Sequence, residues 1–160
     1  MSSSTYDVRA GLAEVAGFSV TGVSLITDQS RASEDIYALW ETFFTQRIGQ
    51  VLEARLDEVI MAVYSDYKGD HEAPYRITIG YRTPDDAPVP NGLHRVQVMH
   101  QNYAVLSAGG EQPKALMQTW EAVWSGDLPR SFKTDFEAYG PRFFEAGVHE
   151  VLVHVGLENA

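Results

Sequence analysis

The sequence of 160 residues contains no cysteine, which excludes disulfide bonds, thiolate metal sites and a thiol nucleophile. It also has no apolar run near the roughly 18 residues that a membrane-spanning helix needs. Its first residues lack the basic head and the apolar stretch of a secretory signal. These absences lead us to expect a cytoplasmic protein that makes no contact with a membrane.

Positive charge is scarce, because 12 lysine and arginine residues stand against 22 aspartate and glutamate residues, which gives a net charge of −10. The average field of such a surface repels nucleic acid and other polyanions and attracts cations. We therefore expect no direct binding of nucleic acid.

The motifs of common enzyme classes are absent as well. The sequence has no Walker loop, no dinucleotide-binding fingerprint and no G-x-S-x-G nucleophile elbow. Its five histidines form no helical His-x-x-x-His pair, and His149 and His154 are expected on opposite faces of one strand. We therefore expect no metal site, no cofactor and no standard set of catalytic residues.

The hydrophobic pattern of the first half predicts a strand, a helix and two further strands. The expected elements are a strand at residues 15–27, a helix from about 33 to 51, and strands at 59–64 and 75–82. Gly49 lies inside the expected helix, at a cost of about 1 kcal/mol relative to alanine. Residues 84–92, with three prolines and an Asn-Gly pair, then form a linker to the second half.

The second half repeats the same kinds of element. The expected elements are strands at residues 93–98 and 103–107, a helix from about 113 to 126, and strands at 136–139 and 149–155. Trp40 and Trp120, each followed by glutamate, take comparable positions on the two helices, 80 residues apart. We therefore predict one domain over residues 1–160 with an internal duplication, whose pseudo-repeats span about 15–82 and 93–156.

Two such strand-helix-strand-strand units can join their strands into one antiparallel sheet with both helices on one face. The expected fold class is therefore α+β, a tandem repeat with a ligand groove between the two repeats.

Aromatic residues gather at the predicted strands and their flanks. Tyrosines on the open face of a sheet expose apolar area to water unless a ligand covers them. A flat or cationic organic ligand would do so by stacking and by cation–π attraction, worth roughly 0.5–2 kcal/mol per contact. By contrast, we expect four aromatic residues on the helices to belong to the core: Trp40, Phe43, Phe44 and Trp124.

Glu137 is the candidate acidic group for such a site. It lies on the short predicted strand next to Phe136 and close to Tyr139, where strict alternation places Asp135, Glu137 and Tyr139 on one face. An acidic side chain among aromatic rings would complete a site for a lipophilic cation. The alternative is an ordinary glutamate exposed to solvent.

Several fragments in a fixed order carry a family resemblance. They are residues 39–43 (LWETF), 62–67 (AVYSDY), 75–80 (YRITIG), 101–106 (QNYAVL), 120–124 (WEAVW), Arg130 and 135–139 (DFEAY). In this order and spacing, across residues ~15 to 156, the chain resembles the GyrI-like, or AraC-type effector-binding, superfamily, in particular its stand-alone and integron-associated members. It departs from the family pattern at the turn where Asn102 precedes Tyr103, since relatives usually have glycine before the aromatic residue.

The resemblance implies a tandem strand-helix-strand-strand fold that binds small aromatic or cationic molecules between the repeats. It places the binding glutamate at Glu137. It also implies aromatic walls at Tyr64, Tyr81, Tyr103, Trp120 and Tyr139. In multidomain relatives the module follows a DNA-binding helix-turn-helix, for which we expect no room because the first predicted strand begins near Val15.

Three functions follow as hypotheses. The leading one is a stand-alone effector-binding protein for a lipophilic, aromatic or cationic compound, used in drug sensing or, through a partner regulator protein, in transcriptional regulation. The second is a hydrolase similar to GyrI-like enzymes that act on reactive cyclopropane-bearing natural products, with Glu137 assisting the attack of water. The third is an acidic protein-interaction module similar to gyrase inhibitors.

Overall fold

One antiparallel sheet organises the molecule in the computed structural model, which describes residues 11–70 and 72–158. Its eight strands are β1 (Gly11–Val15), β2 (Phe18–Thr27), β3 (Ile60–Ser65), β4 (Tyr75–Thr83), β5 (His94–Val98), β6 (Gln101–Ala108), β7 (Asp135–Tyr139) and β8 (Val151–Gly156). They lie in the order β1-β6-β8-β7-β3-β4-β2-β5. The helical elements are α1 (Ala32–Thr45), α2 (Ile48–Val51), α3 (Lys114–Ser125) and the 3-10 turn η1 (Pro141–Phe144).

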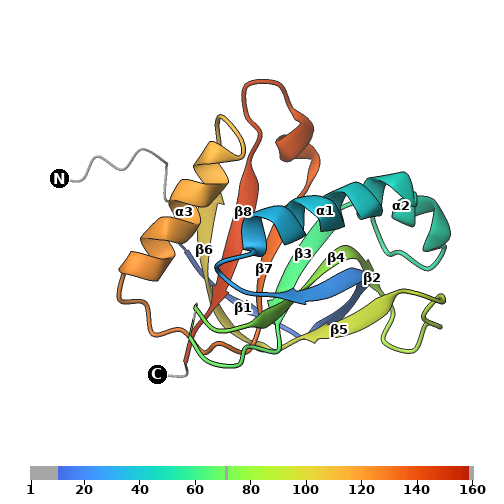
Figure 1. Cartoon of the computed structure of the whole chain (residues 1–160), viewed down its shortest axis with the longest axis horizontal. Helices are drawn as coiled ribbons and strands as arrows, with labels where there is room; N and C mark the ends of the chain where they lie inside the picture. Colours follow the sequence, from blue (N-terminus) through green and yellow to red (C-terminus); the bar gives the residue numbers. More distant parts are fainter. Residues whose placement is uncertain (1–10, 71, 159–160) are drawn as a thin grey trace.

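The expected α+β fold with an internal repeat is confirmed. The units β2-α1-β3-β4 and β6-α3-β7-β8 follow the same order, and they meet where β3 pairs with β7 at the centre of the sheet. Figure 1 shows α1 and α3 on the same face of the sheet, with β7 and β8 passing between them. None of the helices in the described residues has the length and apolar character needed to span a bilayer.

The two edge strands are exchanged between the halves. The N-terminal strand β1 pairs with β6 of the second unit, whereas β5, which follows the proline-rich segment, pairs with β2 of the first unit. The sequence pattern placed β5 with the second repeat. It predicted β2 with a start three residues too early, at Val15, and it missed β1 as a separate strand with a different partner. Periodicity within a strand carries no information about which strand lies beside it.

Two other expected elements have different limits. The single helix expected at residues 33–51 ends at Thr45, and Arg47 has a left-handed backbone (φ 50°) before α2 begins. Phe43 and Ile48 are both buried in the core between helices and sheet, so the apolar stripe continues across this break. His149 and His154 do not share a strand as expected, because β8 begins only at Val151.

The core lies on both faces of the sheet, and alternation along β7 divides it. Glu137 and Tyr139 point to the face that carries the helices, where the larger hydrophobic cluster lies. Phe136 points to the other face and packs there in a smaller cluster with Val20, Val63 and Tyr103. The alternation predicted for this strand is therefore the one that the structure has.

Two glycines allow an unusually close approach of β2 and β4. Gly22 pairs with Gly80, and a Cβ atom on Gly22 would lie 1.9 Å from the carbonyl oxygen of Ile79. Backbone cannot move aside as a side-chain end can, so we expect Gly22→Ala to lower the free energy of unfolding by about 1–3 kcal/mol. Urea denaturation would measure the loss. Gly11→Ala is the control, because nothing lies within 4 Å of its Cβ position, and equal effects of the two substitutions would contradict this prediction.

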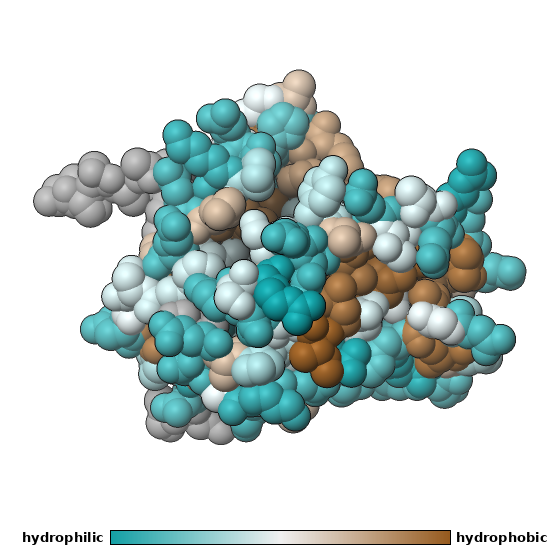
Figure 2. All heavy atoms as spheres, in the orientation of Figure 1, coloured by the Kyte–Doolittle hydropathy of each residue, from teal (hydrophilic) through white to brown (hydrophobic). Residues whose placement is uncertain are grey.

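Most of the surface that carries the helices is polar. Figure 2 shows hydrophobic residues gathered in the half of this face where α1 and α2 lie, surrounded by hydrophilic ones. Phe44, Val51 and Leu56 are among the exposed large hydrophobic residues. Exposed apolar surface therefore lies on the side of the molecule that carries α1 and α2.

Candidate functional site

A buried carboxylate lies at the junction of the two halves. Glu137 is 2% exposed, and its strand β7 pairs with β3 there. The hydroxyl of Tyr64 on β3 and the indole nitrogen of Trp120 on α3 both donate hydrogen bonds to Oε2, each at 2.7 Å. The hydroxyl of Tyr139 donates to Oε1 at 2.6 Å. One carboxylate thus gathers three aromatic donors from two strands and a helix.

The environment of Glu137 decides its charge and that of its neighbours. Burial raises the pKa of Glu137, and the three donated hydrogen bonds only partly oppose that rise. Burial and the nearby carboxylate raise the pKa of Tyr64 and Tyr139 well above that of an ordinary phenol, so both remain hydrogen-bond donors at neutral pH. In the described part of the chain, Glu137 has no cationic partner.

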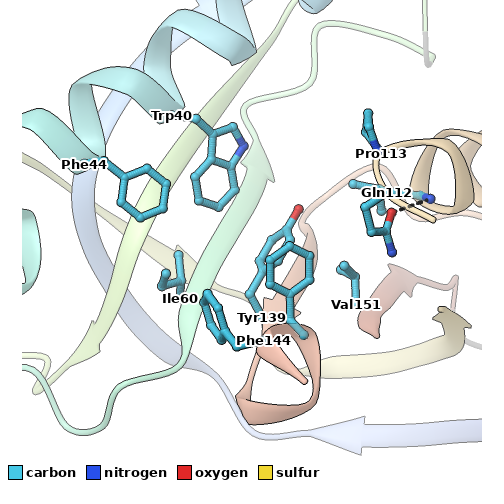
Figure 3. A pocket seen from close by; sticks show the side chains of 10 residues that line it. Trp40, Phe44, Ile60, Gln112, Pro113, Tyr139, Phe144 and Val151 are labelled. Carbon is cyan, nitrogen blue, oxygen red and sulfur yellow. Dashed lines mark hydrogen bonds between the residues drawn. The ribbon is translucent and has the colours of Figure 1, made fainter. Parts of the chain in front are cut away.

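An apolar cavity of about 260 Å³ lies next to this carboxylate. It is lined by Trp40, Phe44, Ile60, Gln112, Pro113, Leu116, Tyr139, Phe143, Phe144 and Val151. Figure 3 shows Trp40 and Phe44 reaching from α1 toward Tyr139, with Gln112 and Pro113 on the opposite side. Because Tyr139 both lines the cavity and donates to Glu137, the carboxylate is one hydrogen bond away from the lining.

Aromatic rings that pack against one another form much of the cavity wall. Trp40 meets Tyr139 edge-on with centroids 5.1 Å apart and stacks on Phe44 at 5.9 Å. Phe143 contacts Tyr139 from the other side at 5.0 Å. Gln112 donates to the carbonyl oxygens of Ala108 and His149, so its amide nitrogen is occupied by backbone. The lining therefore offers ring faces and edges, and Tyr139 links it to the Glu137 carboxylate.

Protein donors already occupy three of the roughly four lone-pair sites of the Glu137 carboxylate. Each oxygen of Glu137 already accepts a hydrogen bond from a protein donor. A general base needs an oxygen available to the water that it deprotonates. No group of three histidine, aspartate or glutamate side chains among residues 11–70 and 72–158 is arranged to hold a metal ion.

Three of the five aromatic residues proposed as walls surround Glu137: Tyr64, Trp120 and Tyr139. They lie on the helix-covered face rather than on an open face of the sheet, where the aromatic argument had placed tyrosines. The other two proposed residues are elsewhere. Tyr103 lies on the opposite face, donating to the carbonyl oxygen of Met99, and Tyr81 lines a different cavity, beside Phe43.

Trp40 and Phe44 line the cavity, although the sequence pattern assigned them to the core. Phe44 is 58% exposed and Trp40 is half-buried. An apolar stripe on a helix does not separate a residue that faces the core from one that faces a cavity beside it. The 80-residue spacing of Trp40 and Trp120 was the available signal, because both tryptophans meet the site: Trp120 donates to Glu137 and Trp40 contacts Tyr139.

A second buried acid on β7 has its charge neutralised. Asp135 is fully buried and accepts hydrogen bonds from Arg130 (Nη2, 2.7 Å), from the Tyr67 hydroxyl and from the Gly156 backbone nitrogen (2.7 Å). The Arg130 guanidinium also lies over the ring of Phe132, 4.2 Å from its centroid. Asp135 and Glu137 thus share a face, but among residues 11–70 and 72–158 only Asp135 has a cation beside it.

Comparisons with known proteins give a consistent result. The model of a family described as integron-associated effector-binding proteins matches residues 12–152. The YobU protein of Bacillus subtilis is 29% identical over 128 residues, which cover 78% of this chain and 80% of YobU. The transcriptional regulator BrlR of Pseudomonas aeruginosa is 27% identical over 143 residues, or 86% of this chain. These residues cover 50% of BrlR, so the chain spans about half the length of that relative.

Two solved structures share the fold. The integron cassette protein VCH_CASS2 of Vibrio cholerae aligns with a TM-score of 0.74 at 21% identity, covering 97% of this chain and 100% of that one. SAV2435, solved with bound tetraphenylphosphonium, aligns with a TM-score of 0.75 at 15% identity, covering 94% of each chain.

Proposed function

The chain belongs to the family of integron-associated effector-binding proteins, and we propose that the effector it binds is a lipophilic organic cation. One observation carries the proposal. Glu137 is a buried carboxylate that lacks a cationic partner in the described residues and is one hydrogen bond away from an aromatic cavity. Burying an unpaired charge is costly, and three donated hydrogen bonds offset only part of the cost. A bound cation supplies the missing charge.

The cavity lining favours the same class of ligand. Organic cations are attracted to aromatic ring faces, by up to about 2 kcal/mol per ring when both are desolvated. Trp40, Phe44 and Tyr139 offer three such rings on one side of the cavity. The net charge of −10 adds a long-range field that attracts cations. Tetraphenylphosphonium, bound by the structurally similar SAV2435, is an ion of this class and supports the proposal.

We propose further that this chain acts as one effector-binding domain, with Glu137, Tyr64, Trp120 and Tyr139 at its binding site. Its output would be regulatory and would pass through a separate regulator protein. The similarity to YobU and BrlR, both described as transcriptional regulators, supports a regulatory output.

Two ions of the same shape and opposite charge test the proposal. We expect tetraphenylphosphonium to bind at least roughly 100-fold more tightly than tetraphenylborate, as measured by isothermal titration calorimetry in 0.15 M salt. Two unit charges roughly 8 Å apart interact by about 2 kcal/mol at an effective dielectric constant of ~20, and the sign reverses for the anion. Neutral triphenylphosphine oxide should fall between them. Equal affinities of the two ions, or tighter binding of the borate, would exclude a cation site.

A further inference from the structure

Phe44 lines the aromatic cavity and also a second cavity. The second cavity measures about 300 Å³ and is lined by Phe43, Phe44, Arg47, Ile48, Gly49, Gln50, Arg55, Glu58 and Tyr81. Phe44 therefore contributes to the lining of both cavities. Its ring is 58% exposed, with Trp40 stacked on one side and Phe43 meeting it edge-on at 5.1 Å. A side chain this exposed can change rotamer without disturbing the core.

The second cavity, unlike the first, is lined in part by charged side chains. Arg55 donates through Nε to Glu58 at 2.9 Å, which neutralises both groups. Arg47 forms no ion pair with any other residue in the described ranges, which leaves one positive charge uncompensated. The residue is exposed and lies where the backbone reverses between α1 and α2.

A hydroxyl group adds a neutral donor to this lining. A Cβ atom on Gly49 would lie 2.9 Å from the Tyr81 hydroxyl oxygen, so glycine at this position leaves room for the hydroxyl in the cavity wall. Tyr81 is otherwise buried, on the same strand face as the core residues Ile77 and Ile79. The second cavity thus presents a free guanidinium and a phenol, both of which bind acceptors.

Size provides an independent reason to consider the two cavities together. At about 260 Å³, the aromatic cavity lies below the range of roughly 300–1,000 Å³ that is usual for drug-sized ligands. A drug-sized ligand would therefore extend beyond it, and the second cavity shares the exposed ring of Phe44 with the first.

We propose that the two cavities are subsites of one elongated site, in which the second takes the acidic or hydrogen-bond-accepting tail of a ligand whose aromatic cationic body fills the first. The natural ligand would then be an amphiphilic zwitterion, or a cation with a strongly accepting tail. This inference rests on the proposed function of the first cavity and adds Arg47 and Tyr81 as residues that determine specificity.

Three phosphonium ions with one head group test the inference. The probes are methyltriphenylphosphonium, hexyltriphenylphosphonium and (5-carboxypentyl)triphenylphosphonium, each titrated by calorimetry. We expect the carboxypentyl ion to bind about 5–10-fold more tightly than the hexyl ion, as a charge-assisted hydrogen bond to Arg47 predicts. The protein's net charge of −10 opposes an anionic tail, so such a gain reports a local positive group.

Substitutions of Arg47 test whether this residue causes the tighter binding of the carboxypentyl ion. Asparagine tolerates the left-handed backbone, so Arg47→Asn should keep the fold while reducing the carboxypentyl-to-hexyl affinity ratio to below about 2. Arg47→Lys restores the charge and should recover most of the ratio. The inference is overturned if the carboxyl group gives no gain in the wild type, or if the gain survives in Arg47→Asn. If even methyltriphenylphosphonium, which has no tail, does not bind, both the proposed function and this inference are wrong.

Discussion

Replacing Glu137 with glutamine should weaken the binding of tetraphenylphosphonium by roughly 30-fold at pH 7.5. The substitution removes a unit charge that is buried and unpaired by any cation in the described residues. At a separation of roughly 8 Å and an effective dielectric constant of ~20, that charge contributes about 2 kcal/mol to holding a cation. Calorimetry or the quenching of tryptophan fluorescence would measure the change.

The glutamine variant should still fold, because its amide can serve the same three partners. The indole of Trp120 only donates, so the amide oxygen takes the position of Oε2 beside Trp120 and Tyr64. The amide nitrogen then faces Tyr139, whose hydroxyl can rotate to accept. We expect the free energy of unfolding to change by no more than about 1.5 kcal/mol. Glu121→Gln, at an exposed site on α3, is the matched control for a loss of one negative charge.

Protonation of Glu137 should reproduce the effect of the substitution. Only the ionised carboxylate attracts the cation, so affinity falls as the pH falls through the pKa of Glu137. Burial raises that pKa, so the loss should begin at a higher pH than for an exposed glutamate. Affinity of Glu137→Gln should stay flat over this range, and that of Glu121→Gln should follow the wild type. A wild-type affinity that does not change with pH would argue against a charge-based role.

The largest effect on stability is expected at Arg130. We predict that Arg130→Ala lowers the free energy of unfolding by about 3–5 kcal/mol, because it leaves the carboxylate of Asp135 buried without its cation. The side chains of the pair are 6% and 0% exposed, and Arg130 also packs over Phe132. Tyr67 and the Gly156 nitrogen would remain as donors to Asp135, but they carry no charge. Urea denaturation with circular dichroism would measure the loss.

An exposed ion pair supplies the control for Arg130. Arg31 and Asp35 lie on α1 and its N-terminal flank at 3.6 Å, with the arginine side chain 70% exposed. Solvent screens such pairs, so Arg31→Ala should cost no more than about 1 kcal/mol. A similar cost at the two arginines would mean that burial of the Arg130–Asp135 pair does not matter to stability.

The repeat and the sheet could be predicted from the sequence because both depend on local periodicity. Strands such as β4 alternate cleanly, and Trp40 and Trp120 mark the two helices at equal intervals. The break at Arg47 could not be predicted in this way, since the buried residues on either side of it continue one apolar stripe. The partners of β1 and β5 depend on contacts between distant segments, which periodicity does not encode.

The residues around Glu137 could be predicted from the sequence, but the other residues that line the cavity, such as Trp40 and Phe44, could not. Alternation along β7 placed Glu137 and Tyr139 on one face, and the family resemblance pointed to Tyr64 and Trp120. Tyr103 was proposed on the same grounds, but its side chain lies on the opposite face of the sheet. An aromatic residue on a strand has an equal chance of facing either side until the register of its neighbours is known.

The exchanged edge strands restrict how a ligand can enter. Each half of the sheet is closed by a strand from the other half of the chain, so the halves are interlocked rather than merely abutted. Hinging them apart would break the β3–β7 ladder and strain the two-residue connections that join β1 to β2 and β5 to β6, with several backbone hydrogen bonds lost at once. The sheet beneath the aromatic cavity is therefore rigid. A ligand enters the cavity when exposed side chains that line it, such as Phe44 and Phe144, change rotamer.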